Sequence, residues 1–191
     1  MICAPPKCGA FFCYSYIQLF NIIFAVAIQN MHAMNTPAQL ARHFREVYFG
    51  GNWTWVNLKD TLADVSWAQA TTPLQSLNTI AALTYHINYF VCAASRVLQG
   101  KPIDAHDKYS FGVPPISSQQ DWEALLNKTW DDAERFSILV AQLPESTLVD
   151  TFEDEKYGTY YRNIQGIIEH THYHLGQIAV IKKLLLGPLA C

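Results

Sequence analysis

The chain has 191 residues, of which half are apolar and 13% are aromatic. This length predicts one domain with a substantial core, and the apolar content excludes a disordered chain. The formal net charge is -3. The chain therefore lacks the basic excess of proteins that grip phosphates, and we expect no nucleic-acid partner.

The first 33 residues differ in composition from the rest of the chain. Residues 9–28 form an apolar run, for which three interpretations are open. In the first interpretation, the true start of the protein lies downstream, at Met31 or Met34. In the second, the run is a secretory signal, with the small-x-small cleavage pattern at residues 25–27. The third interpretation is a retained membrane anchor, because the run approaches the ~20 residues that span a bilayer.

The surroundings of the run argue against both a secretory signal and a membrane anchor, because only one basic residue, Lys7, precedes it. We therefore treat residues 1–33 as an extension and predict a folded domain over residues 34–191. The five cysteines include no C-x-x-C pair, and three of them lie in this extension. The remaining two make no disulfide framework, which is typical of a reducing compartment. We expect a cytoplasmic protein without membrane contact, or a secreted or periplasmic one if the signal peptide is genuine.

The remainder of the chain is patterned as helices. Thr36 and Pro37 are typical of a helix start, and Leu40, Phe44 and Val47 then recur at spacings of four and three. Four long amphipathic segments are predicted, at residues 36–49, 76–98, 119–143 and 162–186, with a short helix near residues 58–65. No strong alternating run accompanies them. The pattern predicts an all-α four-helix bundle.

The third long segment is expected to have one buried face and one face exposed to water. Trp122, Leu125, Leu126, Phe136, Leu139 and Val140 form its expected buried stripe. The acidic side chains are expected to face water: Asp121, Asp131, Asp132 and Glu134.

The fourth long segment contains two histidines at the spacing of metal ligands. His170 and His174 are four residues apart, which on a helix means about 40° of rotation and about 6 Å of rise. Their rings can converge on one ion, with Zn–N bonds of ~2.0–2.1 Å. Both lie on the apolar stripe, whereas His172 points away and is expected to be partly exposed.

A third inward histidine, His86, lies in the middle of the second long segment, on a face with Leu83 and Phe90. A lone histidine on such a face is usually a hydrogen-bonded core residue. Three inward histidines without partners would be costly to bury, which favours a metal site made of His86, His170 and His174. A bundle with hydrogen-bonded core histidines is the alternative.

The motif excludes several metal enzymes. A zincin requires H-E-x-x-H, and the glutamate position is Thr171 here. Di-iron bundles require several inward Glu-x-x-His pairs, which the segments do not offer. No cysteine lies near the site, which disfavours a closed structural zinc.

Two stretches carry a family resemblance: residues 77–86 (LNTIAALTYH) and residues 170–178 (HTHYHLGQI). With one histidine midway along the second helix and H-x-x-x-H-x-Gly-Gln on the last, the chain resembles the DinB/YfiT-like superfamily over residues 37–186. The resemblance implies an up-down-down-up bundle with a long crossover. It also implies that His86, His170 and His174 hold nickel or zinc, and that the protein forms a homodimer.

The relatives implied by this resemblance include thiol-dependent S-transferases, a maleylpyruvate isomerase and proteins labelled as metal-dependent hydrolases. Three protein ligands leave a coordination position open to water or substrate, as in catalytic zinc sites. The leading hypothesis is a metal-dependent hydrolase or a thiol S-transferase that acts on a small molecule. A non-catalytic stress-related protein that binds a metal or small ligand is the alternative. The candidate helper residues are Tyr85 and Gln177, followed by Asn88, Tyr89, Glu153, Glu155 and Tyr161.

Overall fold

The computed structural model describes residues 35–186. The chain divides into two units, Met1–Asn35 and Thr36–Cys191. Expectations for the apolar run before Asn35 lie outside the described residues. The second unit holds six α-helices within the described residues, and none of these residues belongs to a β-strand. The predicted all-α class is confirmed.

Four helices are long: α2 (Thr36–Phe49), α5 (Ile80–Leu98), α6 (Gln119–Ala141) and α7 (Tyr160–Leu186). Two are short, α3 (Leu58–Leu62) and α4 (Trp67–Thr71). Three 3₁₀ turns lie in the connections: η1 (Asp107–Tyr109), η2 (Glu145–Val149) and η3 (Glu155–Tyr157). Among the described residues, no helix is both long enough and apolar enough to cross a bilayer.

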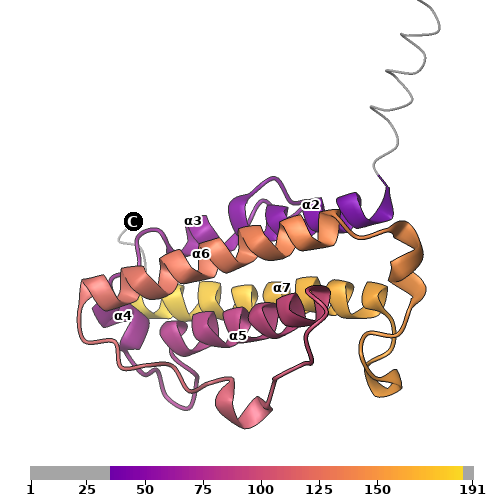
Figure 1. The fold of residues 1–191 in the computed structure, drawn as a ribbon. Coiled ribbons are helices and arrows are strands. Elements are labelled where there is room, and N and C mark those ends of the chain that lie inside the picture. Colours follow the sequence, from indigo (N-terminus) through magenta and orange to yellow (C-terminus); the bar gives the residue numbers. More distant parts are fainter. Residues whose placement is uncertain (1–34, 187–191) are drawn as a thin grey trace, which may run out of the picture. The chain divides into compact units, whose positions relative to one another are not determined.

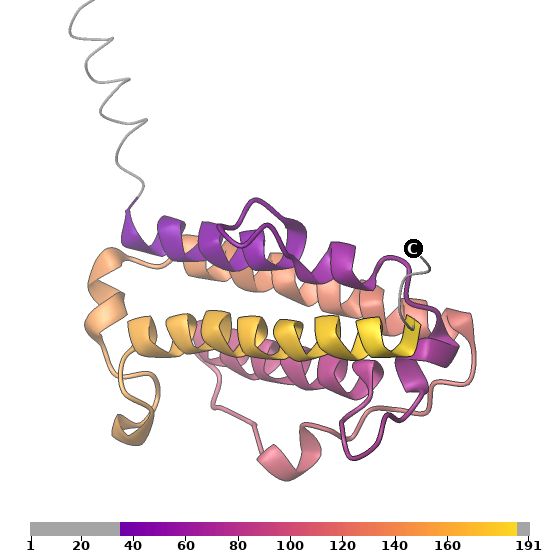
Figure 2. The same ribbon diagram turned by 180° about the vertical axis from the view of Figure 1, so that it is seen from behind.

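The long helices form a closed ring of contacts: α2 packs on α6, α6 on α5, α5 on α7, and α7 on α2. Figure 1 shows α5 and α6 running in the same direction, with α2 and α7 running the opposite way. Residues 99–118 therefore return along the whole length of the helices between the end of α5 and the start of α6. Figure 2 shows the same arrangement from behind, with α7 beside α5.

The apolar stripes meet in one core at the centre of this ring. Phe44 of α2 and Phe136 of α6 are fully buried with ring centroids 4.6 Å apart, and Trp122 donates its indole N–H to the carbonyl of Val65 at 2.8 Å. Burial of such side chains stabilises a fold by roughly 1.5–3 kcal/mol each. The core fixes how α5 and α7 face each other, and these two helices carry the three histidines.

Helix boundaries follow local capping chemistry, which corrects one predicted helix start and accounts for one helix that was not predicted. Helix α5 begins at Ile80 and not at residue 76, because Thr79 caps it by accepting a hydrogen bond from the Ala82 amide at 3.1 Å. The preceding residues form a turn closed by Leu77 and Leu74. Helix α4 was not predicted, although Ser66 and Gln69 form a capping box that marks its start.

One buried acid contradicts the sequence expectation. Asp132 was expected to face water, but it is only 7% exposed. Its carboxylate lies against α5, where it accepts hydrogen bonds from Asn88 Nδ2 at 2.9 Å and from Cys92 Sγ at 3.1 Å. Lys128, one turn earlier on α6, supplies a third donor. These donors compensate the carboxylate for its loss of water.

Candidate metal centre

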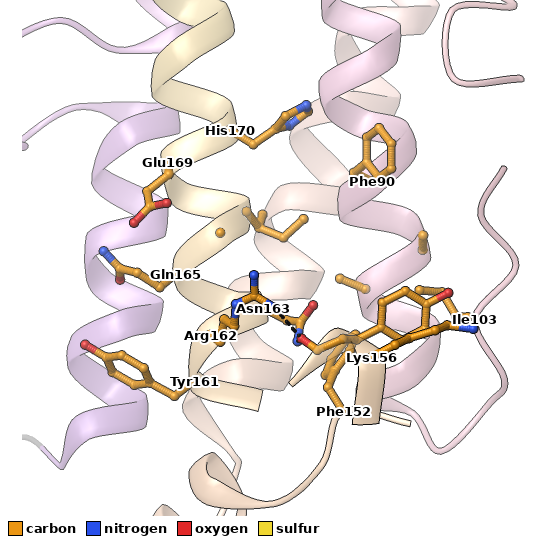
Figure 3. Close-up of a pocket in the computed structure, with 15 residues that line it drawn as sticks. Phe90, Ile103, Phe152, Lys156, Tyr161, Arg162, Asn163, Gln165, Glu169 and His170 are labelled. Atoms are coloured by element: carbon orange, nitrogen blue, oxygen red, sulfur yellow. Dashed lines mark hydrogen bonds between the residues drawn. The ribbon is translucent and has the colours of Figure 1, made fainter. Parts of the chain in front are cut away.

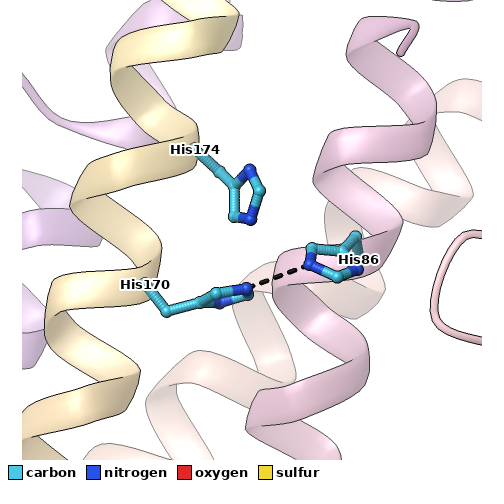
Figure 4. A group of neighbouring side chains, drawn as sticks. All are labelled: His86, His170 and His174. Carbon is cyan, nitrogen blue, oxygen red and sulfur yellow. Dashed lines mark hydrogen bonds between the residues drawn. The ribbon is translucent and has the colours of Figure 1, made fainter. Parts of the chain in front are cut away.

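Helices α5 and α7 bring the three predicted histidines together (Figure 4). His86 comes from α5, while His170 and His174 come from successive turns of α7. Each offers one ring nitrogen, and these nitrogens all lie within 4.8 Å of one another. Nε2 of His86 lies 3.0 Å from Nε2 of His170. His86 and His174 are buried and His170 is half-buried.

A hydrogen bond from the connection between α5 and α6 orients His86. Its Nδ1 lies 2.9 Å from Ser110 Oγ. The Ser110 hydroxyl donates its own proton to the Asp107 carbonyl at 2.7 Å. The serine oxygen must therefore accept from His86, which assigns the proton to Nδ1. This leaves the Nε2 lone pair of His86 facing the other two rings.

His174 is oriented in the same way by its own helix. Its Nδ1 lies 2.7 Å from Oε1 of Gln177, one turn further along α7. A carbonyl oxygen only accepts, so Nδ1 carries the proton and Nε2 of His174 is free for coordination. Metal-binding histidines are commonly held by such an outer hydrogen bond. Gln177 was a sequence candidate, and the structure places it in contact with a predicted ligand.

Aromatic rings shield the histidine cluster from water. Phe111 stacks on His86 with ring centroids 3.9 Å apart and an interplanar angle of 9°. The Phe90 ring makes T-shaped contacts with the rings of both His86 and His170, with ring centroids 5.1 and 5.2 Å apart. Apolar walls of this kind lower the local dielectric and limit access of solvent to the rings.

This environment favours neutral imidazoles. Burial, reinforced by the nearby His174, lowers the pKa of His86 to about 4. Burial also lowers the pKa of His170 to about 4, with His174 and His86 acting in the same direction. Since the charged forms of both rings are disfavoured, both are neutral at pH 7, as a metal ligand must be.

The three histidines lie close enough to hold a metal ion. Two nitrogens bound to one ion at ~2.0–2.1 Å are about 2.9–3.4 Å apart for bond angles between octahedral and tetrahedral values. The 3.0 Å between His86 and His170 lies in that range. In the metal-free chain the same contact requires a proton, which His170 donates to the Nε2 lone pair of His86.

A cavity of about 660 Å³ adjoins the cluster (Figure 3). His170 and Phe90 lie at one end, and Lys156 and Arg162 line it farther along. Gly166, between Arg162 and His170 on α7, contributes only backbone to the wall. A Cβ added there would meet no atom within 4 Å. The histidine cluster therefore has open space beside it for a small molecule.

The other helper candidates lie in three places. Tyr85, Asn88 and Tyr89 line a second cavity on a different face of α5. Tyr161 lines the cavity next to His170. Glu153 accepts a hydrogen bond from the Ile103 amide at 2.9 Å, and Glu155 is exposed on η3. None of these six residues forms a hydrogen bond with a histidine of the cluster, and their catalytic roles stay predictions.

His172 lies away from the cluster, as its position on the helix predicted. It is half-buried and faces His43 of α2, with ring centroids 6.1 Å apart. Burial and the neighbouring His43 lower its pKa.

Sequence reasoning missed Ser110 and Phe111. Both lie in the aperiodic stretch at residues 101–118, where no helical spacing indicates which side chains turn inward. Chain connectivity alone could not place them beside His86.

Comparison with known proteins adds no assignment: no family model, curated protein or solved structure matches the chain.

Proposed function

We propose that this chain is a divalent-metal-binding protein of the DinB/YfiT-like type, built on an up-down-down-up four-helix bundle with a long crossover. The ring of contacts among the four long helices supports the bundle. The return of residues 99–118 along α5 supports the crossover. The two sequence stretches that end at His86 and begin at His170 support the family.

One observation carries the metal proposal: three histidine nitrogens converge within 4.8 Å beside a cavity of about 660 Å³. A structural zinc site is normally closed by four protein ligands, whereas three ligands leave room for substrate. When bound, nickel or zinc supplies Lewis-acid chemistry, which lowers the pKa of a bound water or thiol. Imidazole ligands suit both metals.

We propose a metal-dependent hydrolase or a thiol S-transferase acting on a small molecule. His170 and Arg162 are eight residues apart on α7, which corresponds to about 12 Å along the helix. Arg162 donates one N–H to the Tyr157 carbonyl at 3.2 Å and keeps other donors for a ligand. A substrate whose anionic group binds Arg162 or Lys156 would have its reacting end next to His170.

A pair of glycine variants tests this use of the cavity. Gly166→Leu fills the cavity, while Gly176→Leu places the same side chain at an exposed position of α7 that also has no atom within 4 Å. Both changes favour the helix, by up to about 1 kcal/mol. We expect metal-loaded Gly166→Leu to lose turnover of thiol-plus-electrophile or ester substrates, and Gly176→Leu to keep it.

The assay first requires that the metal-loaded protein turns over a substrate faster than a His86→Ala control does. One panel combines low-molecular-weight thiols with electrophiles, and a second contains esters and amides. Equal activity in Gly166→Leu and Gly176→Leu would place the reaction elsewhere. Absence of turnover across all panels, with metal bound, would reject the enzyme proposal.

A non-catalytic metal- or ligand-binding protein is the second candidate. It is favoured by the hydrogen-bond partners of the ligands, Ser110 and Gln177, neither of which titrates near neutral pH. We also propose a homodimer, on the family resemblance alone. Sedimentation velocity of the purified chain tests it, and a monomer at micromolar concentration would contradict it.

A further inference from the structure

A second cavity, of about 630 Å³, lies on a different face of α5 from the histidine cluster. Its walls come from three parts of the chain: α5, α6 and residues 113–116 of the connection between them. Aromatic and aliphatic side chains line most of it: Tyr85, Tyr89, Val113, Pro114, Pro115, Ile116, Ala124 and Leu125. The candidate ligands His86, His170 and His174 do not line this cavity.

The polar part of the wall is organised around Asp132. Asn88, Cys92 and Lys128 line the cavity, and each donates a hydrogen bond to the Asp132 carboxylate. Burial opposes the charge of Asp132, but these donors outweigh it and keep its pKa below the ordinary value. Lys128 is thus neutralised by an ion pair, and a ligand meets no unpaired charge from it.

Asn88 holds one hydrogen-bonding atom that no described residue uses. The residue is 4% exposed, and its Oδ1 is buried without a hydrogen-bond partner among residues 35–186. Its Nδ2 is committed to Asp132, so the amide cannot rotate to exchange the two atoms without breaking that bond. Oδ1 is therefore a fixed acceptor, and a buried acceptor of this kind requires a donor.

We propose that this second cavity binds a small, uncharged aromatic molecule that carries a hydroxyl or N–H donor. The aromatic body packs between Tyr85, Pro115 and Leu125, and the donor bonds to Asn88 Oδ1. The other charged residue of the wall, Asp121, does not call for a cationic ligand, because its carboxylate already accepts hydrogen bonds from Ser117 and Ser118. The proposal stands independently of the metal site.

Cys92 provides a local readout, because its half-buried thiol lines the cavity. The probes are 4-ethylphenol and 4-ethylanisole, which share a ring and an ethyl group and differ in the O–H donor. With the full chain, alkylation of Cys92 by N-ethylmaleimide is followed by peptide mass spectrometry at increasing probe concentration. We expect half-maximal protection at a concentration about tenfold lower for 4-ethylphenol, since one hydrogen bond distinguishes the probes.

Two leucine variants on α6 test whether the protection of Cys92 comes from binding in this cavity. Ala124 lines the cavity and Ala141 does not, and both are exposed alanines of the same helix. Ala124→Leu is expected to abolish protection and Ala141→Leu to retain it. Val113→Phe, from the opposite wall, gives a second way to fill the cavity if Ala124→Leu does not fold by circular dichroism.

Each other outcome rejects part of the proposal. Equal protection by both probes would show that Asn88 does not select a donor. Protection that persists when the cavity is filled would place the ligand elsewhere. Absence of protection by 4-ethylphenol up to its solubility limit would reject the site.

Discussion

Ser110 and His86 are 24 positions apart in the sequence, and a hydrogen bond of 2.9 Å joins Oγ of the first to Nδ1 of the second. This bond connects the segment between α5 and α6 to the candidate metal centre. It assigns the proton of His86 to Nδ1 and so directs the Nε2 lone pair towards His170. The position of the connecting segment thus decides whether His86 is ready to coordinate an ion.

Removing this hydrogen bond should weaken metal binding without removing a ligand. We expect Ser110→Ala to reduce the affinity for zinc or nickel by about tenfold or more, the usual effect of losing such an outer contact. Competition with a chromophoric chelator measures the affinity. Ser117→Ala, on the same segment but bonded to Asp121, is the matched control. An unchanged affinity in Ser110→Ala would contradict the role assigned to this serine.

Variants of the three candidate ligands should lose metal, whereas a variant of their neighbour His172 should retain it. Alanine at His86, His170 or His174 is expected to bring the metal content well below one equivalent. His172→Ala should retain near-stoichiometric metal, because His172 faces His43 and not the cluster. Elemental analysis after loading with zinc or nickel decides this.

Metal removal should also lower thermal stability. A ligand present at 100 times its dissociation constant stabilises the folded state by about 2.7 kcal/mol. A chelator should therefore lower the Tm of the loaded wild-type chain and leave that of His86→Ala unchanged. A folded wild-type chain that binds no metal and shows no such shift would instead support hydrogen-bonded core histidines.

Acid should destabilise the metal-free chain over a defined pH range. His86 and His170 have pKa values of about 4 in the folded state, below the ordinary 6.5. The unfolded state therefore binds more protons between pH 6.5 and 4, and the free energy of unfolding falls as the pH falls through that range. We expect a loss of several kcal/mol at most, measured by urea denaturation. His86→Leu should show a clearly smaller loss.

Asp132 and Asp131 are adjacent acids with opposite environments, and their alanine variants should differ in stability. Asp132→Ala leaves Asn88 Nδ2 and the Cys92 thiol without their acceptor, at a cost of about 1–3 kcal/mol. Asp131 is exposed, and its replacement should change the free energy of unfolding by less than about 0.5 kcal/mol. Denaturant unfolding of both variants tests this, and equal stabilities would contradict the compensation of Asp132 by its donors.

Asp132 was wrongly expected to face water, because its charge was given more weight than its position on the helix. Asp132 lies three residues after the buried Thr129 and four before the buried Phe136, which is the spacing of the inward stripe of α6. Its charge suggested solvent, and its position indicated the core. The donors that make burial tolerable come mainly from α5, and helical periodicity within α6 says nothing about them.

Local patterns alone determined much of this protein. The spacing of apolar residues predicted the long helices and the all-α class, because burial of one face repeats with the period of the helix. The four-residue spacing of His170 and His174 placed both rings on one side of α7 for the same reason. Only the tertiary structure brought His86 to them, seated Ser110 and Phe111 against its ring, and left a cavity beside the cluster. These contacts depend on how α5, α7 and an aperiodic segment pack, and side-chain periodicity within one element carries no information about its distance from another.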